Sequence, residues 1–103
     1  MADGEVARHL QIVGQHLVIG YENPAQIRAL VQRGFVGGVY LGRRNAMAKT
    51  ADDLHAEIAA LQSLRHAAGL PPLIIVADQE GGAVSHISPP LPLQKSLATH
   101  HKL

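Results

Sequence analysis

The sequence predicts an α/β fold in which parallel strands are joined by crossover helices. Three short runs rich in Val, Ile and Leu, at residues 16–21, 36–42 and 73–78, alternate with two segments of helical character. The first run is apolar throughout, which is typical of a strand buried on both faces of a parallel sheet. The order strand, helix, strand, helix, strand implies parallel strands with right-handed crossovers.

The first half of the chain is expected to supply a helix, a strand and a second helix. Residues 5–14 have apolar residues near helical spacing, and HLVIGY at 16–21 forms the first strand. In the following segment, ENPAQIRALVQRGF, Asn23 suits the N-cap and Pro24 the first helical position. Gly34 suits the end of this helix.

The second and third strands are expected at VGGVYLG, 36–42, and LIIVAD, 73–78. The polar segment RRNAM at 43–47 follows the second strand as a loop. Residues 88–103, SPPLPLQKSLATHHKL, indicate a proline-rich loop and the start of one more helix.

A longer helix is expected from about 51 to 68. Thr50 is its predicted N-cap, and Asp53 three residues later forms a weak capping box. An apolar stripe should face the core, formed by Leu54, Ile58, Leu61 and Leu64. The polar residues Asp52, Glu57, Gln62 and Arg65 should point elsewhere. The GLPP segment ends the helix, because proline cannot continue it.

Composition excludes several classes of protein. The 103 residues are 47% hydrophobic, enough for a packed layer, and carry a formal net charge of +1 with no basic block. Nucleic-acid binding therefore has no electrostatic support. There is no cysteine, no signal-peptide pattern and no apolar run near the roughly 18 residues of a membrane span. We expect a soluble, cytoplasmic chain without membrane or nucleic-acid partners.

Polar residues follow each predicted strand. Ligand chemistry in α/β sheets gathers at the carboxyl ends of the strands, so these residues should share one edge. They are Tyr21 and Glu22, then Arg43, Arg44 and Asn45, then Asp78, Gln79 and Glu80. Core packing does not require two arginines facing two acids, and the cluster indicates a candidate site.

The segments VGGVYLGRRN and PPLIIVADQEGGAV resemble the N-terminal barrel domain of family 3 glycoside hydrolases, in the bacterial β-N-acetylhexosaminidase branch. IVGQHLVIGY and PPLPLQKSLA are similar to flanking segments of that domain, so the likeness runs from about residue 9 to 98. The resemblance implies that residues 1–103 are a partial domain, the first three β/α units of an incomplete (β/α)8 TIM-type barrel. It implies a carbohydrate substrate and no cofactor.

The resemblance also implies roles for residues of the motif D-Q-E-G-G. Asp78 would accept hydrogen bonds from hydroxyls of the non-reducing sugar, and Gly81 and Gly82 would let the backbone turn over the strand end. The family usually has arginines where this sequence has Ala83 and His86. His86 would then make a shorter, pH-dependent version of a substrate contact.

In the family, the reaction is retaining hydrolysis of terminal β-linked N-acetylglucosamine. Its K-H-F-P-G-H-G type segment, with the histidine acid/base, and its aspartate nucleophile do not occur in these 103 residues, whereas a complete barrel needs about 250. We therefore expect no catalytic residue here, but part of a sugar subsite. The alternatives are a truncated, inactive sugar-binding or assembly module, and a small independent α/β domain.

The sequence also leaves alternatives open for Asp78 and for Arg44. Asp78 and Glu80 do not suit a retaining pair, because such carboxylates flank the bond from opposite sides. Asp78 is then either the sugar acceptor or a structural strand-end acid. Glu80 is expected to be structural, paired with Arg43 or Arg44. Arg44 either borders the sugar site or lies in a solvated loop.

Metal and phosphate sites find no support in the sequence. The seven histidines lack ligand spacing, and the glycine pair at 37–38 is not a phosphate-binding loop. The third strand should leave an apolar edge unpaired, and such edges recruit other chains. We expect a chain that is marginally stable, self-associates or takes up a companion polypeptide at this open edge.

Overall fold

A computed structural model describes residues 2–96. Its main sheet has three parallel strands in the order β1-β2-β3, formed by Val18–Gly20, Gly38–Leu41 and Ile74–Ala77. The helices are α1 (Ala2–Gly14), α2 (Arg28–Arg33), α3 (Arg43–Ala46) and α4 (Ala51–Ala67), with a 3-10 turn η1 (Pro24–Gln26) before α2. The α/β prediction with parallel strands is confirmed.

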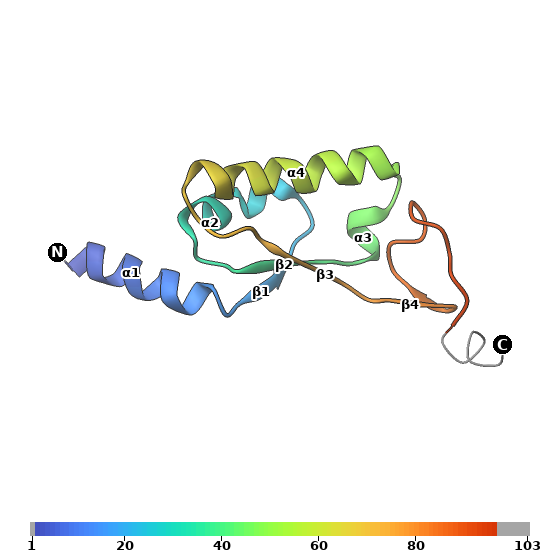
Figure 1. Ribbon diagram of the computed structural model, residues 1–103, viewed down its shortest axis with the longest axis horizontal. Helices are drawn as coiled ribbons and strands as arrows, with labels where there is room; N and C mark the ends of the chain where they lie inside the picture. The colour runs from blue at the N-terminus through green and yellow to red at the C-terminus, as the bar shows by residue number, and fades with distance from the viewer. Residues whose placement is uncertain (1, 97–103) are drawn as a thin grey trace.

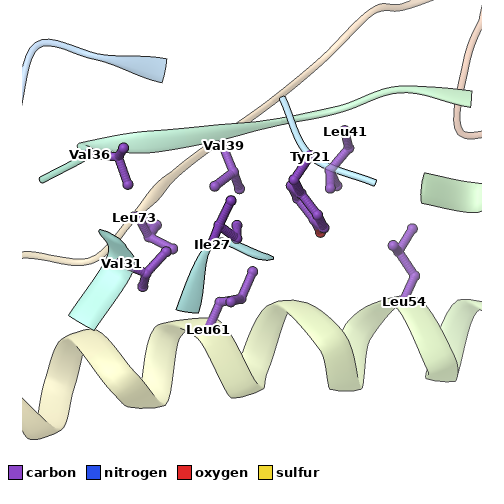
Figure 2. Packing of buried hydrophobic residues seen from close by; sticks show 9 residues of the cluster. All are labelled: Tyr21, Ile27, Val31, Val36, Val39, Leu41, Leu54, Leu61 and Leu73. Atoms are coloured by element: carbon purple, nitrogen blue, oxygen red, sulfur yellow. The ribbon is translucent and has the colours of Figure 1, made fainter. Parts of the chain in front are cut away.

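Helices cover only one face of this sheet (Figure 1). α4 runs along the sheet, and α2 packs against α4. Between them and β2 lies the core shown in Figure 2, made of Tyr21, Ile27, Val31, Val36, Val39, Leu41, Leu54, Leu61 and Leu73. Within the predicted apolar stripe of α4, Leu54 and Leu61 are buried, and Ile58 and Leu64 pack partly buried against them.

Strand alternation divides the side chains between a covered and an open face. On β2, Val39 and Leu41 are buried in the core. On the other face, Val18 is 48% exposed and Ile74 is 59% exposed, one on either side of Gly38 in the register. We call this second surface the open face. Its apolar side chains are exposed because no helix among residues 2–96 covers this face.

The predicted end at Gly34 and the predicted cap of α4 are confirmed, whereas Asn23 caps the turn η1 and α2 itself begins at Arg28. The Asn23 side chain accepts the Ala25 backbone N–H at 2.9 Å, which starts η1. Gly34 ends α2 in the left-handed region, at φ 77°. Thr50 and Asp53 exchange bonds of 3.0 Å between side chain and backbone, which is the capping box that opens α4.

α1 extends away from the sheet along the long axis of the molecule (Figure 1). The molecule measures 60 × 26 × 20 Å. Its end is held by close backbone packing, because a Cβ on Gly14 would lie 2.4 Å from the Phe35 carbonyl carbon. Gln11 adds a hydrogen bond of 2.9 Å to the Arg33 carbonyl oxygen. Across residues 2–96, no helix has both the length and the apolar character needed to cross a membrane.

Regular structure also forms in one segment expected as a loop and in another for which no element was predicted. RRNAM forms the one-turn helix α3. After β3, β4 (Gln79–Gly81) and β5 (Val84–Ser85) form an antiparallel hairpin. Both elements are shorter than sequence periodicity can resolve. The further helix expected at the C-terminal end lies outside the described residues.

The expectation that Arg65 points away from the core is wrong. Its side chain is 1% exposed, and its guanidinium donates to three carbonyl oxygens, those of Val31, Val36 and Pro71. The donor–acceptor distances are 3.2, 2.8 and 2.8 Å. Burial lowers the pKa of Arg65 from its usual value. The planar guanidinium joins the ends of α2 and β2 to the segment that leads into β3.

Candidate functional site

The carboxyl ends of the three strands lie along one edge of the sheet, as the sequence predicts. The strands are parallel and paired in register, so the residues that follow them meet there. Glu22 follows β1, Arg43 and Arg44 begin α3 after β2, and Asp78 follows β3. The candidate site is built from these ends.

A pocket of about 460 Å³ opens between the ends of β1 and β2. Its lining consists of Gly20, Tyr21, Glu22, Gln26, Tyr40, Gly42, Arg43, Arg44 and Asn45. Asp78 does not belong to this lining, but Tyr40 contacts both the pocket and Asp78. Tyr40 therefore joins the β1–β2 pocket to the end of β3.

The structure corrects the expected pairing of Glu80 with Arg43 or Arg44. Arg44 forms its ion pair with Glu22, across the mouth of the pocket, and both side chains are largely exposed. Glu80 lies in β4 on the hairpin and makes no ion pair within residues 2–96. The physical reason is the hairpin, which turns the chain away from β3 directly after Asp78.

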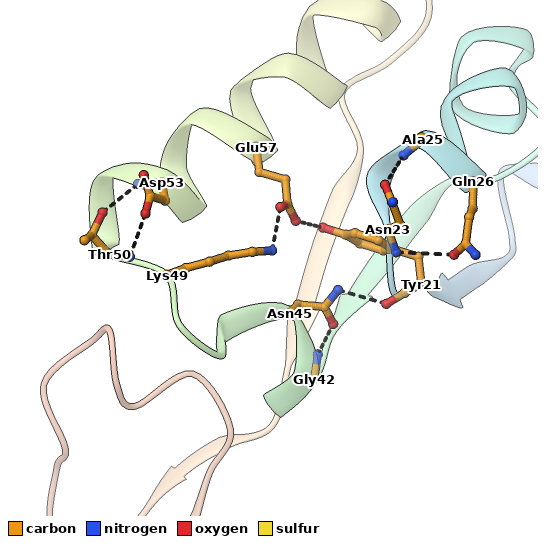
Figure 3. Close-up of polar contacts among 10 residues, drawn as sticks. All are labelled: Tyr21, Asn23, Ala25, Gln26, Gly42, Asn45, Lys49, Thr50, Asp53 and Glu57. Atoms are coloured by element: carbon orange, nitrogen blue, oxygen red, sulfur yellow. Dashed lines mark hydrogen bonds and ion pairs between the residues drawn. The ribbon is translucent and has the colours of Figure 1, made fainter.

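Asn45 fixes the turn between β2 and α3 through two hydrogen bonds (Figure 3). Its side chain is buried and accepts the Gly42 backbone N–H at 2.8 Å. Its amide nitrogen donates to the Tyr21 carbonyl oxygen at 2.8 Å, which ties the end of β1 to the start of α3. Asn45 is therefore a buried structural residue of this turn and does not lie in a solvated loop.

A second set of polar contacts links the same edge to α4 (Figure 3). The Tyr21 hydroxyl donates to Glu57 at 2.6 Å, and Lys49 donates to the other oxygen of this carboxylate at 2.6 Å. Desolvation of the Tyr21 hydroxyl, its hydrogen bond and the negative charge of Glu57 raise the pKa of Tyr21 well above its usual value. Glu57 therefore points inward, contrary to the sequence prediction.

Asp78, Tyr40 and His86 form a cluster at the end of β3. The Tyr40 hydroxyl lies 3.0 Å from Asp78 Oδ2 and 3.0 Å from His86 Nδ1. The His86 Nδ1 atom lies 3.9 Å from the same Asp78 oxygen. The side chain of Asp78 is 59% exposed and that of His86 is 30% exposed, so the cluster faces solvent.

The electrostatics of the cluster favour a neutral tyrosine. Desolvation, the hydrogen bond to Asp78 and the negative charge of this carboxylate raise the pKa of Tyr40 from its usual value. The hydroxyl therefore stays protonated, and its O–H donates a hydrogen bond to Asp78. Asp78 Oδ1 makes no hydrogen bond in the part of the chain that the structure describes, and it remains open to a ligand.

The hairpin places His86 beside Asp78. The His86 backbone N–H donates to the Asp78 carbonyl oxygen at 3.0 Å. The Gln79 side chain then accepts the Ile87 N–H at 3.1 Å and donates to Ser88 Oγ at 2.6 Å. These bonds fix the segment on both sides of His86, so the structure brings Asp78 and His86 together at the end of β3.

Gly81 and Gly82 make the sharp turn that the sequence predicts. Their φ angles are 83° and 63°, a region that residues with a side chain rarely adopt. A Cβ on Gly81 would also lie 2.2 Å from the Lys95 carbonyl oxygen. Together with Glu80, Gly81 lines a separate pocket of about 330 Å³ on the hairpin.

Sequence reasoning missed Tyr40, the residue that connects the parts of the site. Its signal was strand alternation: Tyr40 pairs with Val76 in the register, and Asp78 lies two residues further on the same face. Gly20 and Gly42 leave the space for its ring, since a Cβ on Gly42 would come within 3.2 Å of it.

The arrangement offers hydrogen-bond acceptors and donors on an exposed edge, which suits a ligand with several hydroxyl groups. Among residues 2–96, no three His, Asp or Glu side chains gather into a metal-binding group. Neither a scan against protein-family models nor a search of the curated proteins matched the chain.

Proposed function

We propose that this chain supplies part of the sugar subsite of a family 3 glycoside hydrolase of the β-N-acetylhexosaminidase type. In this proposal its three β/α units are the first units of a (β/α)8 barrel. The observation that carries the proposal is the exposed Asp78 carboxylate at the carboxyl end of β3. One oxygen of this carboxylate is held by Tyr40, and the other makes no hydrogen bond within the described residues.

The arrangement of the sheet supports the proposal. Enzymes with parallel barrels bind their substrates at the carboxyl ends of the strands, where Asp78 lies here. The helices cover one face, as the outer layer of a barrel does, while the apolar open face has the character of a barrel interior. The strand order β1-β2-β3 matches the sequential order of such a barrel.

The chemistry of the site is binding rather than bond cleavage. An ionised carboxylate accepts O–H donors in defined directions, and charge strengthens such hydrogen bonds. The acid/base histidine and the nucleophile implied by the resemblance are absent from this sequence. We expect residues 1–103 to bind a terminal N-acetylglucosamine unit without hydrolysing an aryl β-N-acetylglucosaminide.

The direct test is binding of methyl β-N-acetylglucosaminide, measured by saturation-transfer NMR and by titration. We expect Asp78→Asn to weaken binding roughly tenfold, because the amide loses the charge and one acceptor. Asp52→Asn is the matched control, since Asp52 is an exposed carboxylate on the first turn of α4. Equal binding by both variants, or no binding by the unaltered chain, would contradict the proposal.

A non-catalytic assembly module is the second candidate, and the open face favours it. Val18, Ile74 and Val76 expose apolar surface that a packed protein would normally cover. This candidate predicts association that does not depend on sugar, whereas the first predicts sugar binding that Asp78→Asn weakens.

A further inference from the structure

The hydrogen bonds of the Asp78 cluster can run in only one direction. An ionised carboxylate has no proton to donate, so the Tyr40 O–H must point at Asp78 Oδ2, 3.0 Å away. The same hydroxyl oxygen lies 3.0 Å from His86 Nδ1, and its only remaining role there is that of acceptor. His86 must therefore carry a proton on Nδ1.

We infer that Tyr40 is a positioning residue, which holds Asp78 through Oδ2 and holds neutral His86 as the Nδ1–H tautomer. The chain of donors runs from His86 Nδ1–H to the Tyr40 oxygen, and from the Tyr40 O–H to Asp78. Neutral histidine in water ordinarily carries its proton on Nε2, and the hydrogen bond made by one ring nitrogen decides the state of the other. His86 thus has the less common tautomer because of one tyrosine hydroxyl.

This tautomer determines what the site offers to a ligand. His86 Nε2 makes no hydrogen bond within residues 2–96 and carries a free lone pair on a ring that is 30% exposed. Asp78 Oδ1 is likewise an open acceptor. Two acceptors suit a ligand with adjacent hydroxyl donors, such as a sugar diol; this step rests on the proposed function.

Protonation of His86 changes only one of these groups. The added proton goes to Nε2, which becomes a donor, while the bonds through Tyr40 persist. The other charged groups near Tyr40 are Asp78 and the residues of the β1–β2 pocket, Glu22, Arg43 and Arg44. The charged ring then offers a donor where the neutral ring offers an acceptor, so the site loses one of the two acceptors that suit a diol.

The test that does not need a sugar is NMR of the imidazole nitrogens at a pH where His86 is neutral. Long-range ¹H–¹⁵N spectra distinguish the two tautomers, and His86→Gln identifies the signals of this residue among the seven histidines. We expect the Nδ1–H pattern in the unaltered chain and the Nε2–H pattern in Tyr40→Phe. An Nε2–H pattern in the unaltered chain would overturn the inference, whatever the fate of the variant.

The second arm uses methyl β-N-acetylglucosaminide, with Tyr40→Phe checked for an unchanged fold by circular dichroism. We expect the variant to bind about three- to tenfold more weakly, which is the size of effect that loss of one typical hydrogen bond has. An unchanged affinity would overturn the positioning role. Absence of sugar binding by the unaltered chain would instead refute the proposed function, while the tautomer measurement would still decide this inference.

Discussion

The two faces of the three-stranded sheet are made of the same residue types but have opposite environments. Val39 on the covered face is 0% exposed, beneath α2 and α4. Val18, on the neighbouring strand and the open face, is 48% exposed. Apolar residues on both faces are the pattern of a parallel sheet with two covering layers, and these residues supply only one. The covered face therefore stabilises the fold of the described residues, whereas the open face leaves apolar side chains exposed.

Replacing Arg65 should have the largest effect on the covered side. Arg65→Ala removes three hydrogen bonds to carbonyl oxygens in the core, and an acceptor left unsatisfied there costs roughly 1–3 kcal/mol when it stays buried. Because the Val31 carbonyl oxygen keeps the Gly34 N–H as a donor, we expect a loss of about 3–5 kcal/mol in the free energy of unfolding. Chemical denaturation with circular dichroism measures it.

Arg28→Ala is the control for Arg65, because Arg28 is exposed at the start of α2. It should change stability by less than about 0.5 kcal/mol. A small loss in Arg65→Ala would mean that the buried guanidinium is not what joins α2, β2 and the approach to β3.

The matched pair Val39→Ala and Val18→Ala tests the two faces directly. Val39→Ala removes fully buried methyl groups and should cost about 2–3 kcal/mol. Val18→Ala removes the same atoms from a half-exposed site and should cost less than about 1 kcal/mol. Equal losses in thermal or urea melts would show that the open face is as well packed in solution as the covered one.

Alkaline pH should weaken the covered side through Tyr21. The pKa of Tyr21 is raised in the folded chain, so folding favours the protonated phenol. The stabilisation is fully present below about pH 10, the tyrosine pKa of an unfolded chain, and is lost as the pH rises above it. Urea midpoints between pH 8 and 11 should fall in the unaltered chain and fall less in Tyr21→Phe, whose hydroxyl is absent.

The smallest effect on the folding of one molecule is expected on the open face. Ile74→Lys replaces a side chain that is 59% exposed and should change the stability of the monomer by about 0.5 kcal/mol or less. It should nevertheless lower self-association, because charge on an exposed strand opposes pairing with other chains. Sedimentation at several concentrations measures this; association that persists in Ile74→Lys would place the contact elsewhere.

Local signals in the sequence were enough to predict the helix ends and the parallel strands. Asn23, Gly34 and the pair Thr50 and Asp53 act through neighbours two to four residues away, and all of them lie at the end of a helix or turn. These interactions need no knowledge of the rest of the fold. Arg65 was misplaced because its partners lie up to 34 residues away along the chain.

The candidate site was also predicted only in part, because some of its contacts join residues that lie far apart in the sequence. The motif around Asp78 placed the acid, His86 and the glycine turn at one strand end, as the structure has them. The contribution of Tyr40 depends on the register between β2 and β3, which a single sequence does not reveal. Glu80 was assigned to the arginines because the hairpin of β4 and β5 is too short to produce a periodic pattern.

The central position of β2 has a consequence for the exchange of backbone hydrogens with solvent. β2 alone has a parallel neighbour on both sides, and the core lies against its covered face. Its amides can exchange only when the sheet separates, whereas the outer edge of β3 has no strand beside it among residues 2–96. The slowest deuterium uptake in this chain should therefore lie within Gly38–Leu41, and its rate should report the opening of the whole described structure.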